Sequence, residues 1–314
     1  MAWHGSRFGS DRMIVLGSGG GRYMATTQRR STGGFILQIL DRRIQCHVDP
    51  GPSAARDLRD SHINPKKTSY IFLTHEHNDH DCEVPTIVEA LQDDMEFKSP
   101  KGTLVAAASY FDGKKYFFRL LQRLIGMREG ETVQLENGFA VTATPACHGD
   151  AVPNVGYVME IGAGVARDVA GDLAGDLAGS VPRYRLAFTS DTAPFDGYVA
   201  AYRGVDVLVV NLLRPDDVVC RGHMCTDQLI PLLREVKPAI CILVHFGRRM
   251  DNEVDGDKVP AQARKIQAAI GPGTVVIGAR DGQVIEFGAV APRPGAAPEP
   301  GDSGGHGARA SGFK

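Results

Sequence analysis

The sequence lacks the features that mark membrane, secreted and disulfide-stabilised proteins. No apolar run is long enough to cross a bilayer, and residues 1–12 contain no apolar core of a secretory leader. The six cysteines are scattered without CxxC spacing, so we expect free thiols rather than a disulfide framework. The net charge of −2 argues against a whole-protein field for nucleic acid, although a local basic patch is allowed. We therefore expect a cytoplasmic protein without a membrane partner.

The chain of 314 residues has 43% apolar and 23% charged residues, near the averages of soluble globular proteins, and it is long enough to bury a core. We predict a flexible leader over residues 1–12, one folded domain over 13–288 and a disordered tail over 289–314, which is rich in Pro, Gly, Ala and Ser. Within the domain, residues 163–181 form a low-complexity Ala/Gly/Asp repeat that indicates an exposed insertion. A hairpin is expected across residues 280–282, where two apolar runs flank a turn sequence.

A dense cluster of potential metal ligands follows the short apolar run at residues 70–73. The run predicts a buried strand. Of the six residues 75–80, five can bind a metal, and three of these are histidines. A plain turn does not require so many residues that can bind a metal. The residues that we single out are His75, His77, Asp79 and His80.

Three further predicted strands end in residues of the same chemical kind. The apolar runs at 139–144, 186–189 and 239–244 are followed by His148, Asp191 and His245. One such placement could arise by chance, but four are improbable. Because loops at one edge of a layered α/β protein converge, we expect these side chains to meet. Seven nitrogen and oxygen donors without a thiolate suit two divalent metal ions, with a position left open to solvent as in catalytic sites.

This order of ligands resembles the metallo-β-lactamase superfamily. The motif H-x-H-x-D-H after a strand, then a His, an Asp and a last His, matches over residues 13–288. The resemblance implies the α/β class, with a four-layer αββα sandwich and a site at one edge of its two sheets. Zinc is the default metal, and manganese or iron would also suit these ligands. By this resemblance His75, His77 and His148 hold one ion, Asp79, His80 and His245 hold the other, and Asp191 bridges them.

The resemblance implies a dinuclear metal-dependent hydrolase. Two dications that share a water lower its pKa, so that a bridging hydroxide exists near neutral pH. The same ions neutralise charge that develops on a carbonyl or phosphoryl oxygen. Asp49, at the end of the predicted strand 44–48, could orient a metal-binding histidine from outside the ligand set. It could equally serve as a turn former before Pro50 and Gly51.

Three features resemble the RNase Z branch of this superfamily, which processes tRNA 3′ ends, and its cyclic-phosphodiesterase relatives. They are the glycine-rich run 17–21 followed by Arg29, Arg30 and Ser31, the stretch 64–75, and His223 ahead of a predicted helix. By this resemblance Arg29, Arg30 and Ser31 would contact the substrate. His223 would act beside Asp79 as a catalytic residue, stabilising a phosphate or protonating the leaving oxygen. The alternatives are a plain polar loop for the first set and a helix cap for His223.

The favoured function is therefore that of a phosphodiesterase or nuclease-type hydrolase, with a phosphodiester or nucleic acid as substrate. The basic arm with which RNase Z proteins grip tRNA is not evident, since the repeats at 163–181 are acidic. A smaller phosphodiester or a different nucleic-acid substrate is therefore about as good a candidate as tRNA. The rival is an acyl hydrolase of a thioester, lactone or β-lactam-like amide, which needs no extra histidine. A redox or sensing module is disfavoured. The electron-transfer members of the superfamily, which hold two iron ions, generally come with a flavin domain, and no such domain fits in this chain. A homodimer is compatible with the sequence.

Overall fold

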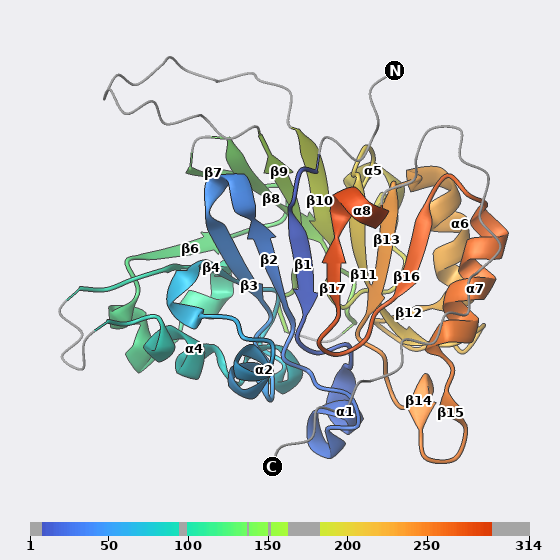
Figure 1. The fold of residues 1–314 in the computed structure, drawn as a ribbon, viewed down its shortest axis with the longest axis horizontal. Helices are drawn as coiled ribbons and strands as arrows, with labels where there is room; N and C mark the ends of the chain where they lie inside the picture. The colour runs from blue at the N-terminus through green and yellow to red at the C-terminus, as the bar shows by residue number, and fades with distance from the viewer. Residues whose placement is uncertain (1–7, 94–98, 137, 150–151, 163–182, 291–314) are drawn as a thin grey trace, which may run out of the picture.

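Two β-sheets lie face to face, and helices cover the outer face of each (Figure 1). The computed structural model describes residues 8–93, 99–136, 138–149, 152–162 and 183–290. Within these residues the architecture is the four-layer αββα sandwich that the resemblance implies. The insertion predicted at 163–181, and nearly all of the tail predicted at 289–314, lie outside the described residues. No helix in the described part is long and apolar enough to span a membrane.

The sheets are mixed, and the strands that precede the predicted ligands, β4 in the first sheet and β8, β10 and β13 in the second, each have a neighbouring strand on both sides. In order across the first sheet, the strands are β17 (Val284–Glu286), β1 (Arg12–Val15), β2 (Phe35–Ile39), β3 (Ile44–Val48), β4 (Thr68–Leu73), β5 (Thr103–Ala107) and β6 (Arg123–Met127). In order across the second sheet, they are β16 (Val275–Gly278), β13 (Ile240–Val244), β11 (Val207–Arg214), β10 (Tyr184–Phe188), β9 (Val155–Ile161), β8 (Phe139–Pro145) and β7 (Thr132–Glu136), with β12 (Met224–Cys225) beside β11.

The helices fall into an outer layer on each side and a group at the edges. The first sheet is covered by α2 (Ala54–Asp60) and α4 (Val84–Ala90), and the second by α5 (Tyr198–Ala201), α6 (Thr226–Val236) and α7 (Val259–Ile270). Apolar residues one turn apart, such as Leu229 and Leu233 of α6, form the face that packs on the sheet. The remaining elements are α1 (Gly21–Thr27), α3 (Asn78–Asp81), α8 (Phe287–Val290) and the small hairpin of β14 (Asp251–Asn252) and β15 (Gly256–Asp257).

The central strands carry nearly continuous apolar sequence because both faces of each sheet are buried. Along β4, Tyr70 and Phe72 belong to the core between the sheets, whereas Ile71 and Leu73 pack under the helices. The two sheets meet through aromatic contacts, as where the rings of Phe72 and Tyr157 lie 5.4 Å apart. This double burial fixes the strand ends in space, and it is from these ends that the predicted ligands project.

The hairpin predicted across residues 280–282 is wrong. β16 pairs in parallel with β13 in the second sheet, whereas β17 pairs antiparallel with β1 in the first. The chain crosses between the sheets here, and Asp281 holds the crossing by accepting hydrogen bonds from the N–H and hydroxyl of Ser18 and the N–H of Ser31, each at 2.7 Å. A local turn pattern carries no information about such distant partners.

Residues 8–12 also differ from the sequence expectation of a flexible leader. Phe8 is fully buried against the rings of Tyr184 and Phe287. Asp11 accepts hydrogen bonds from the Leu40 N–H and the Tyr184 hydroxyl, both at 2.8 Å. One aromatic ring in a short polar stretch gives no periodic signal, so its docking at the sandwich could not be read from the chain. Residues 1–7 lie outside the described part.

Candidate metal centre

β4 delivers the main ligand cluster to one edge of the sandwich. Just after the strand, Thr74 is fixed because its N–H and its hydroxyl donate to the carboxylate of Asp49, both at 2.8 Å. His77 then continues in extended backbone as the residue that precedes α3. The single turn of α3 brings Asp79 and His80 back toward the same point. A strand, an anchored threonine and a short helix thus gather neighbouring residues around one centre.

The first group of donor atoms comes from His75, His77 and His148. Nδ1 of His77 lies 3.0 Å from Nε2 of His75 and 3.0 Å from Nε2 of His148. All three donor atoms lie within 4.8 Å of one another. His148 follows β8 of the second sheet, so this group draws on both sheets.

The second group comes from Asp79, His80 and His245. Nε2 of His245 lies 3.1 Å from Nε2 of His80 and 3.2 Å from Oδ2 of Asp79. His80 Nε2 lies 3.4 Å from the same carboxylate oxygen. His245 stands at the end of β13, again in the second sheet. The two groups are those that the resemblance assigns to two separate ions.

Asp191 lies between the two groups. Its Oδ2 is 3.6 Å from Nε2 of His80 in the second group and 3.9 Å from Nε2 of His148 in the first. Its Oδ1 is 3.2 Å from Nε2 of His245 and accepts a hydrogen bond of 2.8 Å from the Asn211 side chain. The carboxylate is therefore placed where a bridging ligand would stand.

The donor atoms are presented in the form that a metal requires. A neutral histidine that donates a hydrogen bond from Nδ1 has a lone pair at Nε2 with which it can bind a metal. Oxygen atoms accept hydrogen bonds from Nδ1 of three of these histidines. Nitrogen lone pairs that converge beside carboxylates suit divalent cations, so the residues present fit the predicted pair of ions. The acceptors are the Asp49 carboxylate for His80 at 2.8 Å, the Gly222 carbonyl for His148 at 3.0 Å and the Thr74 hydroxyl for His75 at 3.0 Å.

The electrostatics of the centre favour a bound cation. Burial alone would raise the pKa of Asp191, but His245 and His80 hold that pKa well below its usual value. Burial lowers the pKa of His75. Burial opposes a charge on His80 as well, yet Asp79 and the other nearby carboxylates raise its pKa. The carboxylates in and beside the second group therefore favour a cation at this point. A bound metal ion would take the place of the proton on His80.

His223 lies at this centre although it is far from the other histidines in sequence. Its Nδ1 is 3.6 Å from Oδ2 of Asp191, and its ring centroid is 4.7 Å from that of His148. Gly222 sets this position, because its φ is +75° and an added Cβ would lie 1.5 Å from the His148 carbonyl oxygen. Burial, opposed by Asp191, lowers the pKa of His223 to about 4. The ring is therefore neutral near pH 7 in the absence of an added negative charge.

Arg29, Arg30 and Ser31, predicted to contact substrate, lie in a network of protein contacts. Arg29 and Arg30 share the carboxylate of Asp251, with Nε to oxygen distances of 2.6 and 2.8 Å. Ser31 donates its hydroxyl to Asp57. These contacts connect the segment after α1 to the β14–β15 hairpin and to α2. A role in substrate binding stays a prediction for these three residues.

The sequence reasoning missed three residues that touch the ligands. Gly21 donates its N–H to Oδ2 of Asp79 at 2.6 Å, and a Cβ on Gly20 would lie 2.1 Å from the His245 ring. Asn211 lies near the end of β11 and holds Asp191. A signal existed for Asn211, because it follows an aliphatic run just as the predicted ligands do. The glycine run was noted, but nothing local tied it to His245.

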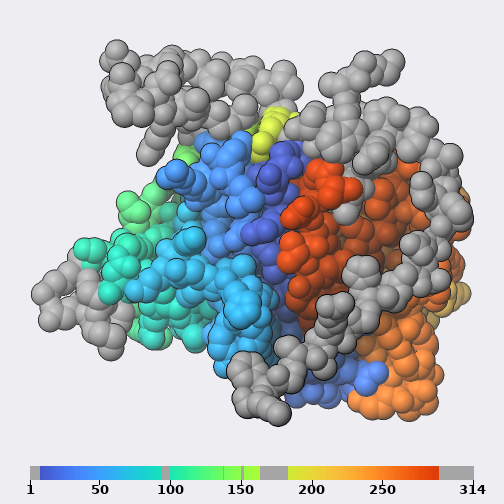
Figure 2. Space-filling view, viewed as in Figure 1, coloured from blue at the N-terminus to red at the C-terminus, as the bar shows by residue number. Residues whose placement is uncertain are grey.

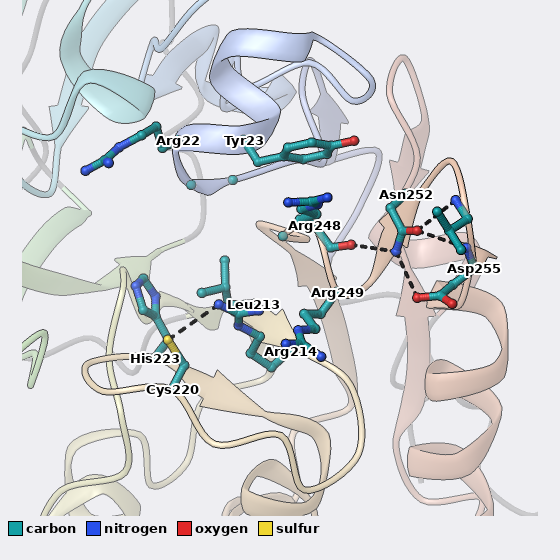
Figure 3. Close-up of a pocket in the computed structure, with 14 residues that line it drawn as sticks. Arg22, Tyr23, Leu213, Arg214, Cys220, His223, Arg248, Arg249, Asn252 and Asp255 are labelled. Carbon is teal, nitrogen blue, oxygen red and sulfur yellow. Dashed lines mark hydrogen bonds between the residues drawn. The ribbon is translucent and has the colours of Figure 1, made fainter.

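A cavity of about 720 Å³ adjoins the centre (Figure 3). Gly20, Gly21 and His223 contribute to its wall, so it shares residues with the ligand environment. Its remaining wall comes from α1, the end of β11, Cys220 and the segment that follows His245. We name it the arginine cavity after the residues Arg22, Arg214, Arg248 and Arg249 that line it.

Comparisons with known proteins agree with the fold and identify the family. A family model described as a beta-lactamase superfamily domain matches residues 44–246. An uncharacterized protein of Methanocaldococcus jannaschii is 29% identical over 250 residues, covering 76% of this chain and 84% of that protein. The ribonuclease Z of Salinispora arenicola is 25% identical over 292 residues, covering 81% and 90%. The solved structure of the metallo-beta-lactamase fold protein YhfI from Bacillus subtilis has a TM-score of 0.64 at 17% identity, covering 88% of this chain and 98% of that one.

Proposed function

Because this chain belongs to the beta-lactamase superfamily and is a metal-dependent hydrolase, we propose that it hydrolyses phosphodiesters at a centre of two metal ions. The observation that carries the proposal is the position of His223. An imidazole stands 3.6 Å from the carboxylate placed between the two donor groups, and it also lines the arginine cavity. Phosphoryl transfer has use for a hydrogen-bond or proton donor at this point, because charge develops on the phosphate and leaving oxygens.

The protein would hold one ion with His75, His77 and His148 and the other with Asp79, His80 and His245, with Asp191 shared. Zinc is the proposed metal, and manganese or iron would be accepted by the same nitrogen and oxygen donors. When bound, the pair supplies Lewis acidity toward a phosphoryl oxygen and a nucleophile at neutral pH.

The chain's own residues prepare and orient this centre. Asp49 holds both Thr74 and the outer nitrogen of His80, so that one carboxylate fixes the two ends of the β4 ligand cluster. Gly21 orients Asp79 by its N–H, and Asn211 orients Asp191 by its side-chain amide. Such partners keep donor atoms in place before an ion or a substrate arrives.

His223 would act on the substrate itself. It is neutral at rest because burial lowers its pKa to about 4. A phosphate anion next to the ring would raise that pKa, so substrate binding favours the form that donates from both nitrogens. His223 would then donate a hydrogen bond to the phosphate or pass a proton to the leaving oxygen. Asp79 would contribute to catalysis through the ion that it helps to hold.

The alternative is an acyl hydrolase that acts on a thioester, a lactone or a β-lactam-like amide, and a two-substrate assay separates it from our proposal. We expect zinc-loaded protein to hydrolyse bis-p-nitrophenyl phosphate with a kcat/KM at least about 100-fold above that for a thioester or a lactam reporter. The metal content of protein purified without added metal should be measured in parallel. The reverse preference would assign the acyl function instead.

A further inference from the structure

The side chains that line the arginine cavity carry more positive than negative charge. Its wall contains four arginines and a single carboxylate, that of Asp255. This carboxylate is already engaged, because it accepts hydrogen bonds from Asn252 at 3.1 Å and from Lys258 at 3.2 Å. Among the described residues, none of the four arginines lies within 4.0 Å of a carboxylate oxygen. The whole chain has a net charge of −2, so this cluster is a local feature.

Contacts within the cavity hold two of these arginines without neutralising them. The guanidinium of Arg248 lies beside the ring of Tyr23 (Figure 3), 5.1 Å from its centroid. The Tyr23 hydroxyl donates a hydrogen bond to Glu253 at 2.6 Å. α1 and the β14–β15 hairpin are thereby joined, and they lie side by side at the surface (Figure 2). Arg214 is half-buried, and one of its terminal nitrogens donates a hydrogen bond to Sγ of Cys220 at 3.8 Å. Its Nε is buried and has no hydrogen-bond partner among the described residues. A buried hydrogen-bond donor without a partner costs free energy of folding, and an anionic ligand that accepted a hydrogen bond from it would remove this cost.

The arginines Arg29 and Arg30 show what a structural arginine looks like in this chain. Both contact Asp251 at 2.8 Å or less, and Arg30 also contacts Asp257 at 2.8 Å. The cavity arginines have no carboxylate oxygen within 4.0 Å in the part of the chain that the structure describes. Their charges are therefore available to a ligand.

The cavity and the metal centre are continuous through shared residues. His223 contacts Asp191 on one side and lines the cavity on the other. Gly20 and Gly21 likewise line the cavity while touching His245 and Asp79. A substrate whose reacting phosphorus lay at the metal centre could extend past His223 into a space that four arginines line.

We propose that the arginine cavity binds a second phosphate group of the same substrate. The substrate class is then a phosphodiester that carries a further phosphate next to the scissile one. Guanidinium groups bind phosphate oxygens in pairs of charge-assisted hydrogen bonds, and a volume of about 720 Å³ is enough for a nucleotide-sized group. This inference rests on the proposed function, since it assigns the first phosphate to the metal centre.

Calorimetric titration of the zinc-loaded full-length protein tests this inference without relying on turnover. The first ligand pair is adenosine 5′-monophosphate and adenosine 3′,5′-bisphosphate. The second is the dinucleotide ApA and the trinucleotide ApApA, both with phosphorothioate linkages that resist hydrolysis during the titration. We expect the added phosphate to lower Kd at least about tenfold in one pair or in both. A gain in the first pair indicates a terminal phosphate, and a gain in the second indicates the next link of a strand. The absence of a gain in both pairs would overturn the inference.

Substitutions of the cavity arginines test whether the gain in affinity arises in the arginine cavity. Arg248→Gln and Arg249→Gln should each reduce the ratio of the two Kd values, and the double variant should bring it near one. Arg264→Gln is the matched control, because Arg264 is exposed on α7 and does not line the cavity, and it should keep the wild-type ratio. If the cavity variants fold poorly, the wild-type ratio measured between low and high salt replaces them, and it should fall as salt rises. A salt-independent ratio, or a ratio retained by the double variant, contradicts the assignment.

The two proposals fail separately. If bis-p-nitrophenyl phosphate is not hydrolysed while the second phosphate still tightens binding, the proposed function is wrong and the cavity is nonetheless an anion site. If the diester is hydrolysed but the added phosphate gives no gain, the proposed function stands and the second-phosphate site does not.

Discussion

Several residues around the metal centre adopt a backbone conformation that most side chains avoid. Asp49, Ser190 and His245 have φ values of +49°, +60° and +63°. Each stands where a strand gives way to a donor atom or to the residue that holds one. Left-handed backbone costs about 1–3 kcal/mol for a residue other than glycine, and it persists where surrounding contacts determine it. At the scale of single residues, these backbone conformations lower the stability of the fold and direct the donor side chains toward one centre.

Two histidines at the centre should respond differently to removal. His77→Ala deletes a donor atom that lies 3.0 Å from two others, so bound metal and phosphodiesterase activity should fall together, with a rate loss of at least about 100-fold. His223→Ala should retain the metal and lose about 10²- to 10⁴-fold in kcat, because its role is toward the substrate. Elemental analysis and bis-p-nitrophenyl phosphate kinetics on both variants check this.

His62→Asn serves as the control for both variants, since His62 is exposed and asparagine tolerates its left-handed backbone. A fully active His77→Ala protein without metal would refute the ligand assignment. Full activity of His223→Ala on the diester would remove the main support for the phosphodiesterase proposal.

At the scale of elements, the donor set depends on how closely neighbouring segments approach. The segment between β1 and α1 passes so near the end of β13 that Gly20 has no room for a side chain. The same holds for Gly222 beside His148. Each glycine allows one loop to pack on a histidine that belongs to another element. The loops around the centre are therefore part of the support of the ligands and not only connections.

Gly20→Ala tests this support. The added Cβ would lie 2.1 Å from the His245 ring, so the ring must move and the second donor group should weaken. We expect bound metal to fall from about two ions to about one per chain, with a loss of stability of about 1–3 kcal/mol. Metal analysis and denaturant unfolding measure the two effects.

Gly273→Ala is the matched control, because an added Cβ there meets no atom within 4 Å. It should keep both the metal content and the stability of the unmodified protein. Equal behaviour of the two alanine variants would show that the approach of this loop does not matter for the centre.

At the scale of the whole molecule, the centre joins the two halves of the sandwich. His75, His77, Asp79 and His80 come from the chain that leaves the first sheet, whereas His148, Asp191 and His245 come from the second sheet. Each donor group combines residues from both sheets. An ion held by these donors would therefore cross-link the sheets at their shared edge, and we expect metal binding to add to global stability.

Metal removal should thus lower the melting temperature. An ion present at about 1,000 times its Kd stabilises the fold by about 4 kcal/mol, so chelation should lower Tm by on the order of 10 °C. Calorimetry of protein with and without chelator, followed by reloading with zinc, measures this. In His77→Ala the drop should be clearly smaller. A Tm that does not respond to chelation in the unmodified protein would mean that the ions do not link the sheets.

The sequence by itself determined the layered α/β architecture and identified the seven side chains that meet at the sandwich edge. It could do so because buried strands are apolar runs, and polar donors at their ends stand out locally in the chain. The role of these seven as metal ligands stays a prediction.

Only the tertiary structure decided which arginines are paired with carboxylates. Arg29 and Arg30 stand next to a glycine run and look like phosphate contacts, yet the distant Asp251 engages both. Arg248 and Arg249 drew no notice in the sequence, and they lie in the wall of the cavity beside His223. The charge available to a ligand depends on which carboxylates the fold brings near each guanidinium, and those partners lie more than two hundred residues apart in the chain. The same reason explains the missed crossing at Asp281, whose partners Ser18 and Ser31 are equally remote in sequence.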